Sequence, residues 1–268
     1  MSNSQPLLVD THCHINMGEL AKDPGKWVRH ARDEGVRFIL AVGIDLSSSL
    51  LALALTREFE EVYAAMGIHP HSAAKWSETD FMRLERLVQD KKVVAVGETG
   101  LDFYRDRAPQ DAQWELFKRT IRLSKETELP IVIHSRDAYA PTLKGLVDLE
   151  QYKVGGVWHC YSYGVEEMKE LVELGYFISL TCAVTHPSKK QLHDVAREVP
   201  LDRLLIETDA PFILPHKMRK AGEKLNRPGW VREAFDAICE LRSISAEDLS
   251  RALANNVKAC FGCEVQGD

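Results

Sequence analysis

The chain has 268 residues, of which 45% are hydrophobic and 28% charged, a composition typical of a globular protein with one large core. Its formal net charge of −6 excludes a molecule-wide basic field that attracts nucleic acid, so any phosphate recognition must come from a local patch or from bound metal. The chain has no long apolar run and its N-terminus is polar, so we expect no membrane span and no signal peptide. Its six cysteines are scattered, so we expect a cytoplasmic protein with reduced thiols.

Short apolar runs alternate with longer amphipathic stretches along the chain. Runs without polar alternation are typical of strands that are buried on both faces of a parallel sheet. The eight predicted strands are Leu7–Val9, Phe38–Val42, Val62–Met66, Val93–Val96, Ile131–Ile133, Gly156–Trp158, Tyr176–Leu180 and Leu204–Ile206.

Helical periodicity fills the intervals between these strands. Ser47 or Ser48 is the expected N-cap of the second helix, and the polar segment from Lys217 to Arg227 is expected to form a loop. The predicted helices are Lys26–Glu34, Ser48–Glu58, Thr79–Gln89, Pro109–Thr127, Ala138–Leu149, Val165–Leu174 and Ser188–Val199, with two more near Gly229–Leu241 and Ala246–Ala254.

Eight strand-then-helix units predict a (β/α)8 TIM barrel, and we expect residues 1–268 to form a single domain. Right-handed crossovers make all strands parallel, so their carboxyl ends open on one face. A doubly wound open sheet is the alternative. It is disfavoured because it would not bring together side chains from the first and eighth strands.

Six segments place a histidine or an acidic residue directly after an apolar run. Imidazole and carboxylate groups are the ligands that borderline and hard divalent metals prefer. Because the ends of all strands share one face, the pattern predicts a metal-dependent hydrolase. The segments are Asp10–His14, Gly67–His71, Gly97–Gly100, His134–Arg136, His159–Tyr161 and Glu207–Pro211.

The first, fourth and eighth strands carry the most informative ligand candidates. His12 and His14 share one face of an extended chain, so both imidazoles can reach one ion. The two oxygens of Glu98 could bridge two ions, and a carboxylate at that buried position requires a cation or a hydrogen-bond donor. Asp209 could bind a metal or act as the general base towards an activated water molecule.

Five further histidine and acid positions lie near strand ends. His134 and His159 end the fifth and sixth strands, and their equivalent positions favour ligands over two unrelated core histidines. His69 is expected to contact the substrate, whereas Pro70 turns the chain so that His71 leaves the site. Asp102 is expected to orient or cap its neighbours.

Cationic and aromatic side chains near the strand ends are candidates for substrate binding. Arg136 suits bidentate phosphate recognition, and Tyr161 is one of several tyrosines and phenylalanines that could stack on bases. The segment after the eighth strand contains five cations that form either a solvated loop or a basic rim around a phosphate substrate. These cations are Lys217, Arg219, Lys220, Lys224 and Arg227.

In this order, the six segments resemble the TatD-type family of metal-dependent deoxyribonucleases, within the amidohydrolase-like barrels. The tail, with Asn255-Asn256-Val257 and Phe261-Gly262, is also similar, so the resemblance covers nearly the whole chain. It implies phosphodiester hydrolysis, often 3′ to 5′ on DNA, with two divalent ions (Mg²⁺, Mn²⁺ or Zn²⁺) and with Glu98 and Asp209 as catalytic residues. The implied partner is DNA, or RNA, with no obligatory protein partner. The resemblance assigns His12, His14, Glu98 and Asp209 to one ion and Glu98, His134 and His159 to the other.

Two positions depart from the family pattern. Tyr161 stands where the family often has phenylalanine, and Arg227 stands where it often has glutamate, which leaves the substrate preference open. Two other functions are alternatives: an amide, ester or lactone hydrolase, including one that removes an acyl group from a nucleic-acid carrier, and a metal-stabilised scaffold. Glu98 occupies a position where many amidohydrolase-like barrels use lysine, which favours the nuclease-like branch.

Overall fold

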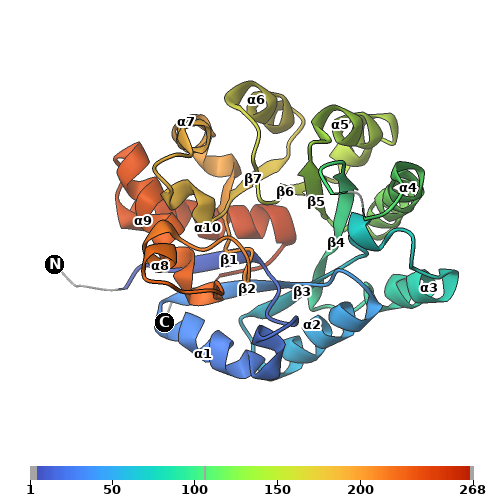
Figure 1. The fold of residues 1–268 in the computed structure, drawn as a ribbon, viewed down its shortest axis with the longest axis horizontal. Coiled ribbons are helices and arrows are strands. Elements are labelled where there is room, and N and C mark those ends of the chain that lie inside the picture. Colours follow the sequence, from blue (N-terminus) through green and yellow to red (C-terminus); the bar gives the residue numbers. More distant parts are fainter. Residues whose placement is uncertain (1–4, 106, 266–268) are drawn as a thin grey trace.

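The computed structural model describes residues 5–105 and 107–265. Eight parallel strands are hydrogen-bonded in sequence order from β1 to β8, and a parallel bridge between Cys13 and Ala210 links the first strand to the segment after the last (Figure 1). The predicted (β/α)8 barrel is confirmed. The strands are β1 Leu8–Cys13, β2 Val36–Val42, β3 Val62–Met66, β4 Val93–Asp102, β5 Ile131–Arg136, β6 Gly156–Trp158, β7 Phe177–Leu180 and β8 Leu204–Ile206.

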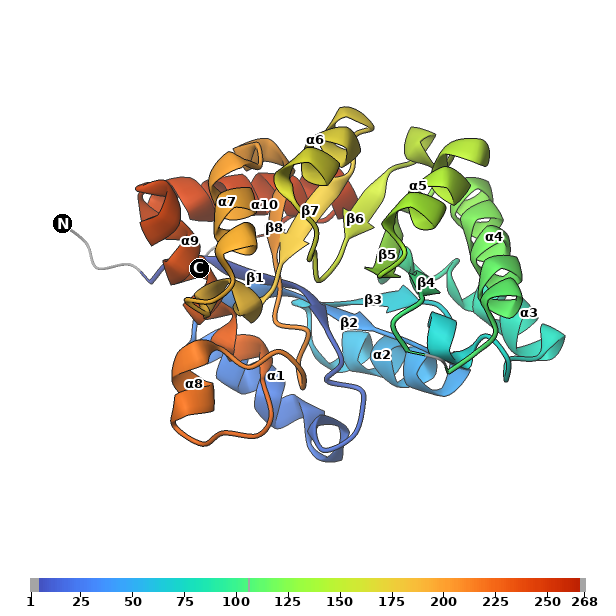
Figure 2. The ribbon, with the colours of Figure 1, turned by 45° about the horizontal axis from the view of Figure 1, so that its top comes forward.

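Helices surround the strands on the outside of the barrel, as the two ribbon views show (Figures 1 and 2). Within the described residues, no helix has the length and apolar character needed to cross a membrane. The helices are α1 Pro24–Asp33, α2 Leu46–Glu58, α3 Glu78–Leu87, α4 Gln110–Thr127, α5 Tyr139–Asp148, α6 Val165–Glu173, α7 Lys190–Glu198, α8 His216–Lys220, α9 Val231–Arg242 and α10 Ala246–Phe261. Short 3-10 turns η1 to η6 lie at Leu20–Lys22, Pro70–Ser72, Gln151–Lys153, Cys182–Thr185, Leu201–Arg203 and Pro228–Trp230.

The apolar residues of the strands form the core, as their continuous hydrophobic runs predict. All ten residues of β4 are buried, including the glutamate and aspartate near its end. Burial of both faces is the reason why these strands lack polar alternation.

Several details of the predicted elements were wrong. The segment after β8 contains the short helix α8 where a loop was expected. The N-cap of α2 is Asp45, whose side chain accepts from the Ser48 N–H in a capping box, rather than Ser47 or Ser48. Helix α10 continues to Phe261, well beyond the predicted end at Ala254.

Candidate metal centre

The carboxyl ends of the strands open into a cavity of about 1010 Å³. Its floor holds imidazole and carboxylate groups from β1, β4, β5 and β6 and from the segment after β8. The structure therefore brings together all six expected metal ligands, His12, His14, Glu98, His134, His159 and Asp209.

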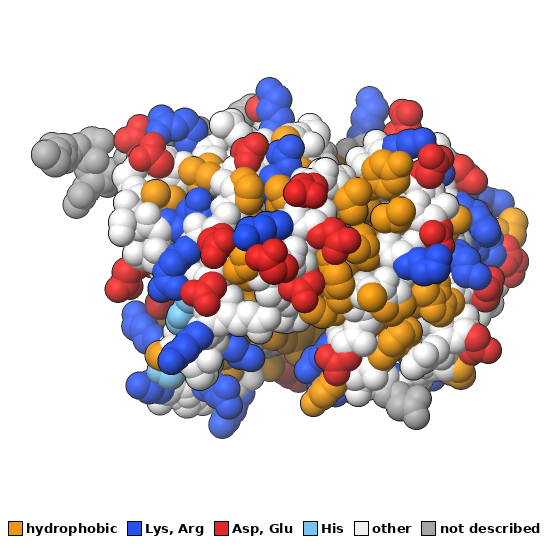
Figure 3. All heavy atoms as spheres, turned by 90° about the horizontal axis from the view of Figure 1, so that it is seen from above, with side chains coloured by type: hydrophobic (Ala, Val, Ile, Leu, Met, Phe, Trp, Pro, Cys, Tyr) orange, Lys and Arg blue, Asp and Glu red, His pale blue; other side chains and the backbone are white. Residues whose placement is uncertain are grey.

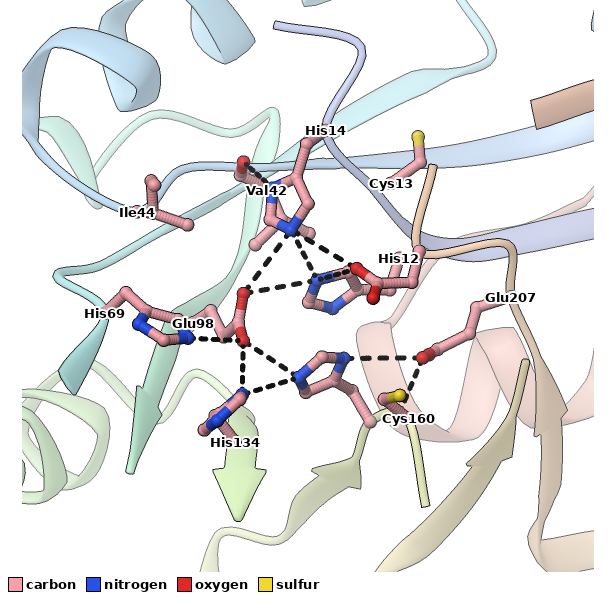
Figure 4. Close-up of polar contacts among 12 residues, drawn as sticks. His12, Cys13, His14, Val42, Ile44, His69, Glu98, His134, Cys160 and Glu207 are labelled. Atoms are coloured by element: carbon pink, nitrogen blue, oxygen red, sulfur yellow. Dashed lines mark hydrogen bonds and ion pairs between the residues drawn. The ribbon is translucent and has the colours of Figure 1, made fainter. Parts of the chain in front are cut away.

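Glu98 lies at the centre of this cluster, with imidazoles pointing towards it from several strands (Figure 4). Its Oε2 lies 3.4 Å from His12 Nε2 and 3.5 Å from His14 Nε2. Its Oε1 lies 2.8 Å from His134 Nδ1 and 2.9 Å from His159 Nε2. The two oxygens thus face two different pairs of candidate ligand imidazoles, and His69 Nε2 lies near Oε1 as well. This arrangement suits a bridging carboxylate.

The backbone before Glu98 requires glycine. Gly97 has a φ of +136°, and a Cβ atom there would lie 2.6 Å from the carbonyl oxygen of Val132 on the neighbouring strand. Side chains larger than hydrogen are excluded both by this backbone conformation and by the close approach of β5. The turn of the chain at Gly97 therefore fixes the position from which Glu98 enters the cavity.

Asp209 completes a second group with His12 of β1 and His14, which directly follows this strand. Its Oδ1 lies 3.5 Å from His14 Nε2 and 3.8 Å from His12 Nε2, and the two imidazole Nε2 atoms are 3.2 Å apart. The Asp209 N–H donates to the His12 carbonyl oxygen at 2.9 Å, so the first and last strands hold each other in place at the ligands themselves.

Charge balance in the buried cluster favours ionised carboxylates. Burial alone would raise the pKa of Glu98, but the imidazoles of His159 and His69 hold it well below its usual value. Burial likewise opposes ionisation of Asp209, and the hydrogen bond from His14 lowers its pKa. The site therefore presents two buried anions, which attract cations strongly because the surroundings screen them poorly.

Three histidines of the cluster have one ring nitrogen that faces away from the cavity, and the contacts of that nitrogen indicate whether the other one could bind a metal ion. His14 Nδ1 donates to the Val42 carbonyl oxygen at 3.1 Å, and His134 Nε2 donates to Asp102 Oδ2 at 3.1 Å. His159 Nδ1 lies 3.4 Å from Glu207 Oε1. An outer acceptor of this kind leaves the other ring nitrogen with its lone pair facing inward, as in metal-binding histidines.

Donor spacing agrees with the same conclusion. Donor atoms bound at about 2.1 Å to a tetrahedral or octahedral ion lie about 3.0–3.4 Å from one another, close to the 3.2–3.8 Å separations among His12, His14 and Asp209. Three sets of donors lie within 4.8 Å of one another: His12, His14 and Asp209; His12, Glu98 and His159; and His69, Glu98 and His134.

His69 differs from the other histidines in its hydrogen bonding. Its Nδ1 accepts the His71 N–H at 3.0 Å, while its Nε2 faces Glu98 Oε1 at 3.3 Å. Burial lowers the pKa of His69 to about 4. A neutral ring whose Nδ1 accepts must carry its proton on Nε2, so His69 is arranged to donate a hydrogen bond into the cavity rather than to bind metal.

Asp102 and Glu207 orient the ligands from outside the cluster. Asp102 also accepts from His71 Nε2 at 2.8 Å, so the expectation that His71 leaves the site was wrong: the 3-10 turn after Pro70 brings its ring back. Glu207 is buried and accepts the Cys160 N–H at 2.6 Å beside His159. The sequence reasoning missed the function of Glu207, although its spacing of two residues from Asp209 was an available signal.

Aromatic and cationic side chains line the rim of the cavity. The Arg136 guanidinium lies 4.2 Å from the centre of the Tyr104 ring, and both residues line the cavity. Phe212 lines the cavity and its ring lies 6.0 Å from that of His14. Tyr161 also lines it, but its hydroxyl donates to the Gly164 carbonyl oxygen at 2.7 Å. Tyr104 and Phe212 are 58% and 53% exposed.

Arg227 does not lie where the sequence reasoning placed it. Its guanidinium packs 3.9 Å from the centre of the Trp230 ring and 5.1 Å from that of Trp27, and it pairs with Glu223 at 3.2 Å. These contacts place Arg227 in a separate hollow of about 340 Å³. The expectation that Arg227 contacts substrate in the cavity is therefore corrected.

Comparisons with known proteins show which family has this arrangement of residues and strands. Residues 9–262 match the family described as TatD related DNase. The chain belongs to the TatD family. It is 36% identical over 255 residues to the metal-dependent hydrolase YabD of Bacillus subtilis, whose name describes it as uncharacterised, covering 95% of this chain and 99% of that protein. TatD of Enterobacter lignolyticus, named a 3′-5′ ssDNA/RNA exonuclease, is 31% identical over 257 residues, covering 95% of this chain and 99% of that protein.

A solved TatD homologue has the same fold. The crystal structure of YjjV from Escherichia coli K12 superposes with a TM-score of 0.89 at 31% identity, covering 96% of this chain and 98% of that one. Together with the conserved architecture, the TatD relatives show that this protein is a metal-dependent hydrolase.

Proposed function

We propose that the protein is a nuclease that uses two divalent ions to hydrolyse the phosphodiester bond at the 3′ end of single-stranded DNA or RNA. The observation that supports this most directly is the central position of Glu98, whose two oxygens face two pairs of imidazoles. The exonuclease names of several relatives support the same reaction. We also propose one catalytic domain over the whole chain.

In this proposal His12, His14, Glu98 and Asp209 hold one ion, and Glu98, His134 and His159 hold the other. Such ions, when bound, lower the pKa of water and stabilise the charge that develops on phosphoryl oxygens. Mg²⁺, Mn²⁺ and Zn²⁺ are all compatible with the mixed nitrogen and oxygen donors.

The remaining side chains bind and orient the substrate. Asp209 is the proposed general base that accepts a proton from the attacking water on its outer oxygen. His69 donates its Nε2–H to a phosphate oxygen, and Arg136 binds a neighbouring phosphate. Tyr104 and Phe212 receive bases of the terminal nucleotides on their exposed rings.

The six cysteines support a location for this reaction. All of them are free thiols, and reduced thiols are typical of a reducing compartment. We therefore propose that the enzyme acts in the cytoplasm.

A matched assay of metal-stripped protein tests the function. The substrates are 5′-labelled single-stranded DNA and an aryl ester, with each metal added back separately to wild type, Glu98→Gln and Asp209→Asn. Glu115→Gln, at an exposed position on α4, is the control. Metal-restored shortening of DNA from the 3′ end, lost in both site variants and kept in the control, is the expected result.

The other outcomes separate the alternatives. Ester hydrolysis without DNA shortening would replace the nuclease with the broader hydrolase of the amidohydrolase type. DNA shortening that persists in Asp209→Asn at the wild-type rate would remove Asp209 as the general base.

A further inference from the structure

A cluster of exposed cations lies beside the opening of the cavity. We call it the α8 patch; in Figure 3 the Lys and Arg side chains gather at the lower left, over α8. It contrasts with the negative net charge of the whole chain. Its members come from α8, from the segment that follows α8 and from the start of α7: Lys217, Arg219, Lys220, Lys224, Lys189 and Lys190.

Most charges of the α8 patch have no acidic partner. Lys217 Nζ lies 3.3 Å from Glu233, and the nearby Glu223 is engaged by Arg227. Within residues 5–105 and 107–265, no ion pair joins the other five cations of the patch to a carboxylate. Desolvation, Lys220, His186 and Arg219 together lower the pKa of His216, consistent with a positive local potential. Unpaired surface cations of this density attract a polyanion.

The α8 patch is continuous with the lip of the cavity. Lys189 lines the cavity itself, and Phe212 and Ile213 line it a few residues before α8 begins. The His216 N–H donates to Thr185 Oγ1 at 2.8 Å, and His186 Nε2 donates to the Leu214 carbonyl oxygen at 2.8 Å. These bonds hold α8 against the η4 turn, so a chain that leaves the cavity past Phe212 meets the patch next.

We propose that the α8 patch binds the sugar-phosphate backbone of a single-stranded nucleic acid outside the cavity while the 3′ end of the same strand lies within it. This inference rests on the proposed function and names the surface that favours long substrates over short ones. A row of cations next to an exposed aromatic ring is the combination that binds single strands without sequence preference. Apart from Lys189, the members of the α8 patch do not line the cavity, so we do not expect them to contact a substrate of one or two nucleotides that lies within it.

Charge reversal separates the α8 patch from the rest of the surface. The test variant carries Arg219→Glu, Lys220→Glu and Lys224→Glu. The control carries Arg83→Glu, Arg86→Glu and Lys91→Glu. These substitutions make the same charge change at exposed positions on α3 and before β4, on the side of the barrel opposite α8 (Figure 1). Thermal melts check that both variants fold.

The first readout is the binding of metal-free protein to a labelled single-stranded oligonucleotide of about 20 nucleotides, measured by anisotropy over a range of salt. We expect at least about tenfold weaker binding for the test variant, and a log–log salt slope shallower by about 2, because each lost single-strand contact removes about 0.7. The control should bind as wild type does. Equal weakening by both triple variants, or no weakening by the test variant, would overturn the proposal.

The second readout is hydrolysis by metal-loaded protein. The KM for the long oligonucleotide should rise in the test variant by a factor similar to the loss of binding, whereas the KM for a trinucleotide should stay within about twofold. A parallel rise for both lengths would contradict the proposal, because it would place the cations at the reacting end.

Two further outcomes keep the inference and the proposed function apart. If metal-loaded wild type cleaves no DNA but binds it through the α8 patch, the nuclease proposal fails and the binding surface stands. If the test variant loses binding to anionic phosphatidylserine vesicles but keeps its affinity for oligonucleotide, the partner is a membrane surface and the inference fails.

Discussion

Histidine orientation at the metal centre depends on acceptors outside the ligand cluster. Asp102 accepts from the outer nitrogen of His134 and from His71, and it also accepts the N–H groups of Tyr104 and Arg105 at 3.0 and 2.9 Å. These donors lower the pKa of Asp102 despite its burial. A carboxylate held in this way fixes the ring of His134 before a metal arrives.

Asp102→Asn should weaken metal binding about 10–100-fold, because the amide accepts less strongly and leaves the His134 ring less well oriented. Titration of metal-stripped protein with Zn²⁺ in a calorimeter measures the change. Asp148→Asn is the control, since Asp148 pairs with Lys144 on the surface of α5. Unchanged affinity in Asp102→Asn would remove this residue from the support of the site.

A second prediction at the residue scale concerns base stacking on Tyr104 and Phe212. Because a stacked base contributes about 1–3 kcal/mol, each alanine variant should raise KM for single-stranded DNA by about 5–150-fold. Steady-state kinetics on one oligonucleotide measures this. Tyr104→Phe keeps the ring and serves as the matched control. If Tyr104→Phe is impaired as much as Tyr104→Ala, the hydroxyl and not stacking is responsible.

At the scale of elements, a buried amide of α10 bonds to the backbone at the start of β8. Asn256 Nδ2 donates to the carbonyl oxygens of Leu201 at 2.8 Å and Leu204 at 2.7 Å. Leu204 begins β8, the strand that precedes Asp209, a proposed metal ligand. The helix therefore supports the closing strand from outside.

Asn256→Ala should lower the free energy of unfolding by about 1–3 kcal/mol, because two buried carbonyl oxygens lose their donor. Urea unfolding followed by circular dichroism measures the loss. The neighbouring Asn255 is exposed on the same helix, so Asn255→Ala is the control and should change stability little. Equal losses in the two variants would contradict a special role of the buried amide, because alanine has the higher helix propensity and the substitution itself should not weaken the helix.

The elements with a strong local pattern could be predicted from the sequence. The strands β3, β6 and β8 were placed correctly, because burial on both faces leaves each as an uninterrupted run without charged residues. The end of β4 was missed: the pairing with β5 is irregular between Val96 and Thr99 and then continues to Asp102, beyond the apolar run that ends at Val96.

Tertiary contacts decided the features that the sequence did not predict. Asn255-Asn256 lies inside α10, where a buried amide has partners on β8 that no local pattern reveals. Arg227 packs on Trp27 and Trp230 outside the cavity. Trp27 is distant in the sequence, and no local pattern marks Trp230 as a partner. The convergence of the histidine and acid motifs was predictable only because parallel strands must end on one face.

At the scale of the whole molecule, the ligands join strands that are far apart in the chain. Asp10 of β1 accepts the Thr208 N–H at 2.9 Å and the Thr208 hydroxyl at 2.7 Å, and burial raises its pKa to about 8. His12 and Asp209 lie on the two sides of the same junction, where the first strand meets the segment after the last. Bound metal should therefore stabilise the complete barrel and not a local segment.

Metal addition should raise the unfolding temperature of stripped protein. A ligand that binds only the folded state at 100 times its Kd contributes about 2.7 kcal/mol, which corresponds to several degrees for a domain of this size. Differential scanning calorimetry with Zn²⁺ or Mn²⁺ measures the shift, and His14→Ala should reduce it. An identical melting temperature with and without metal would show that the cluster does not bind these ions in the folded state.

The seam between β1 and β8 has a consequence for the protein during its synthesis. His12 leaves the ribosome early, but its partner Asp209 follows almost two hundred residues later, and the backbone bond between them forms only when the barrel closes. A partly translated or proteolysed chain therefore carries no assembled hydrolytic centre. The proposed nuclease would therefore be inactive towards the nucleic acids around a polysome until its last strand is in place.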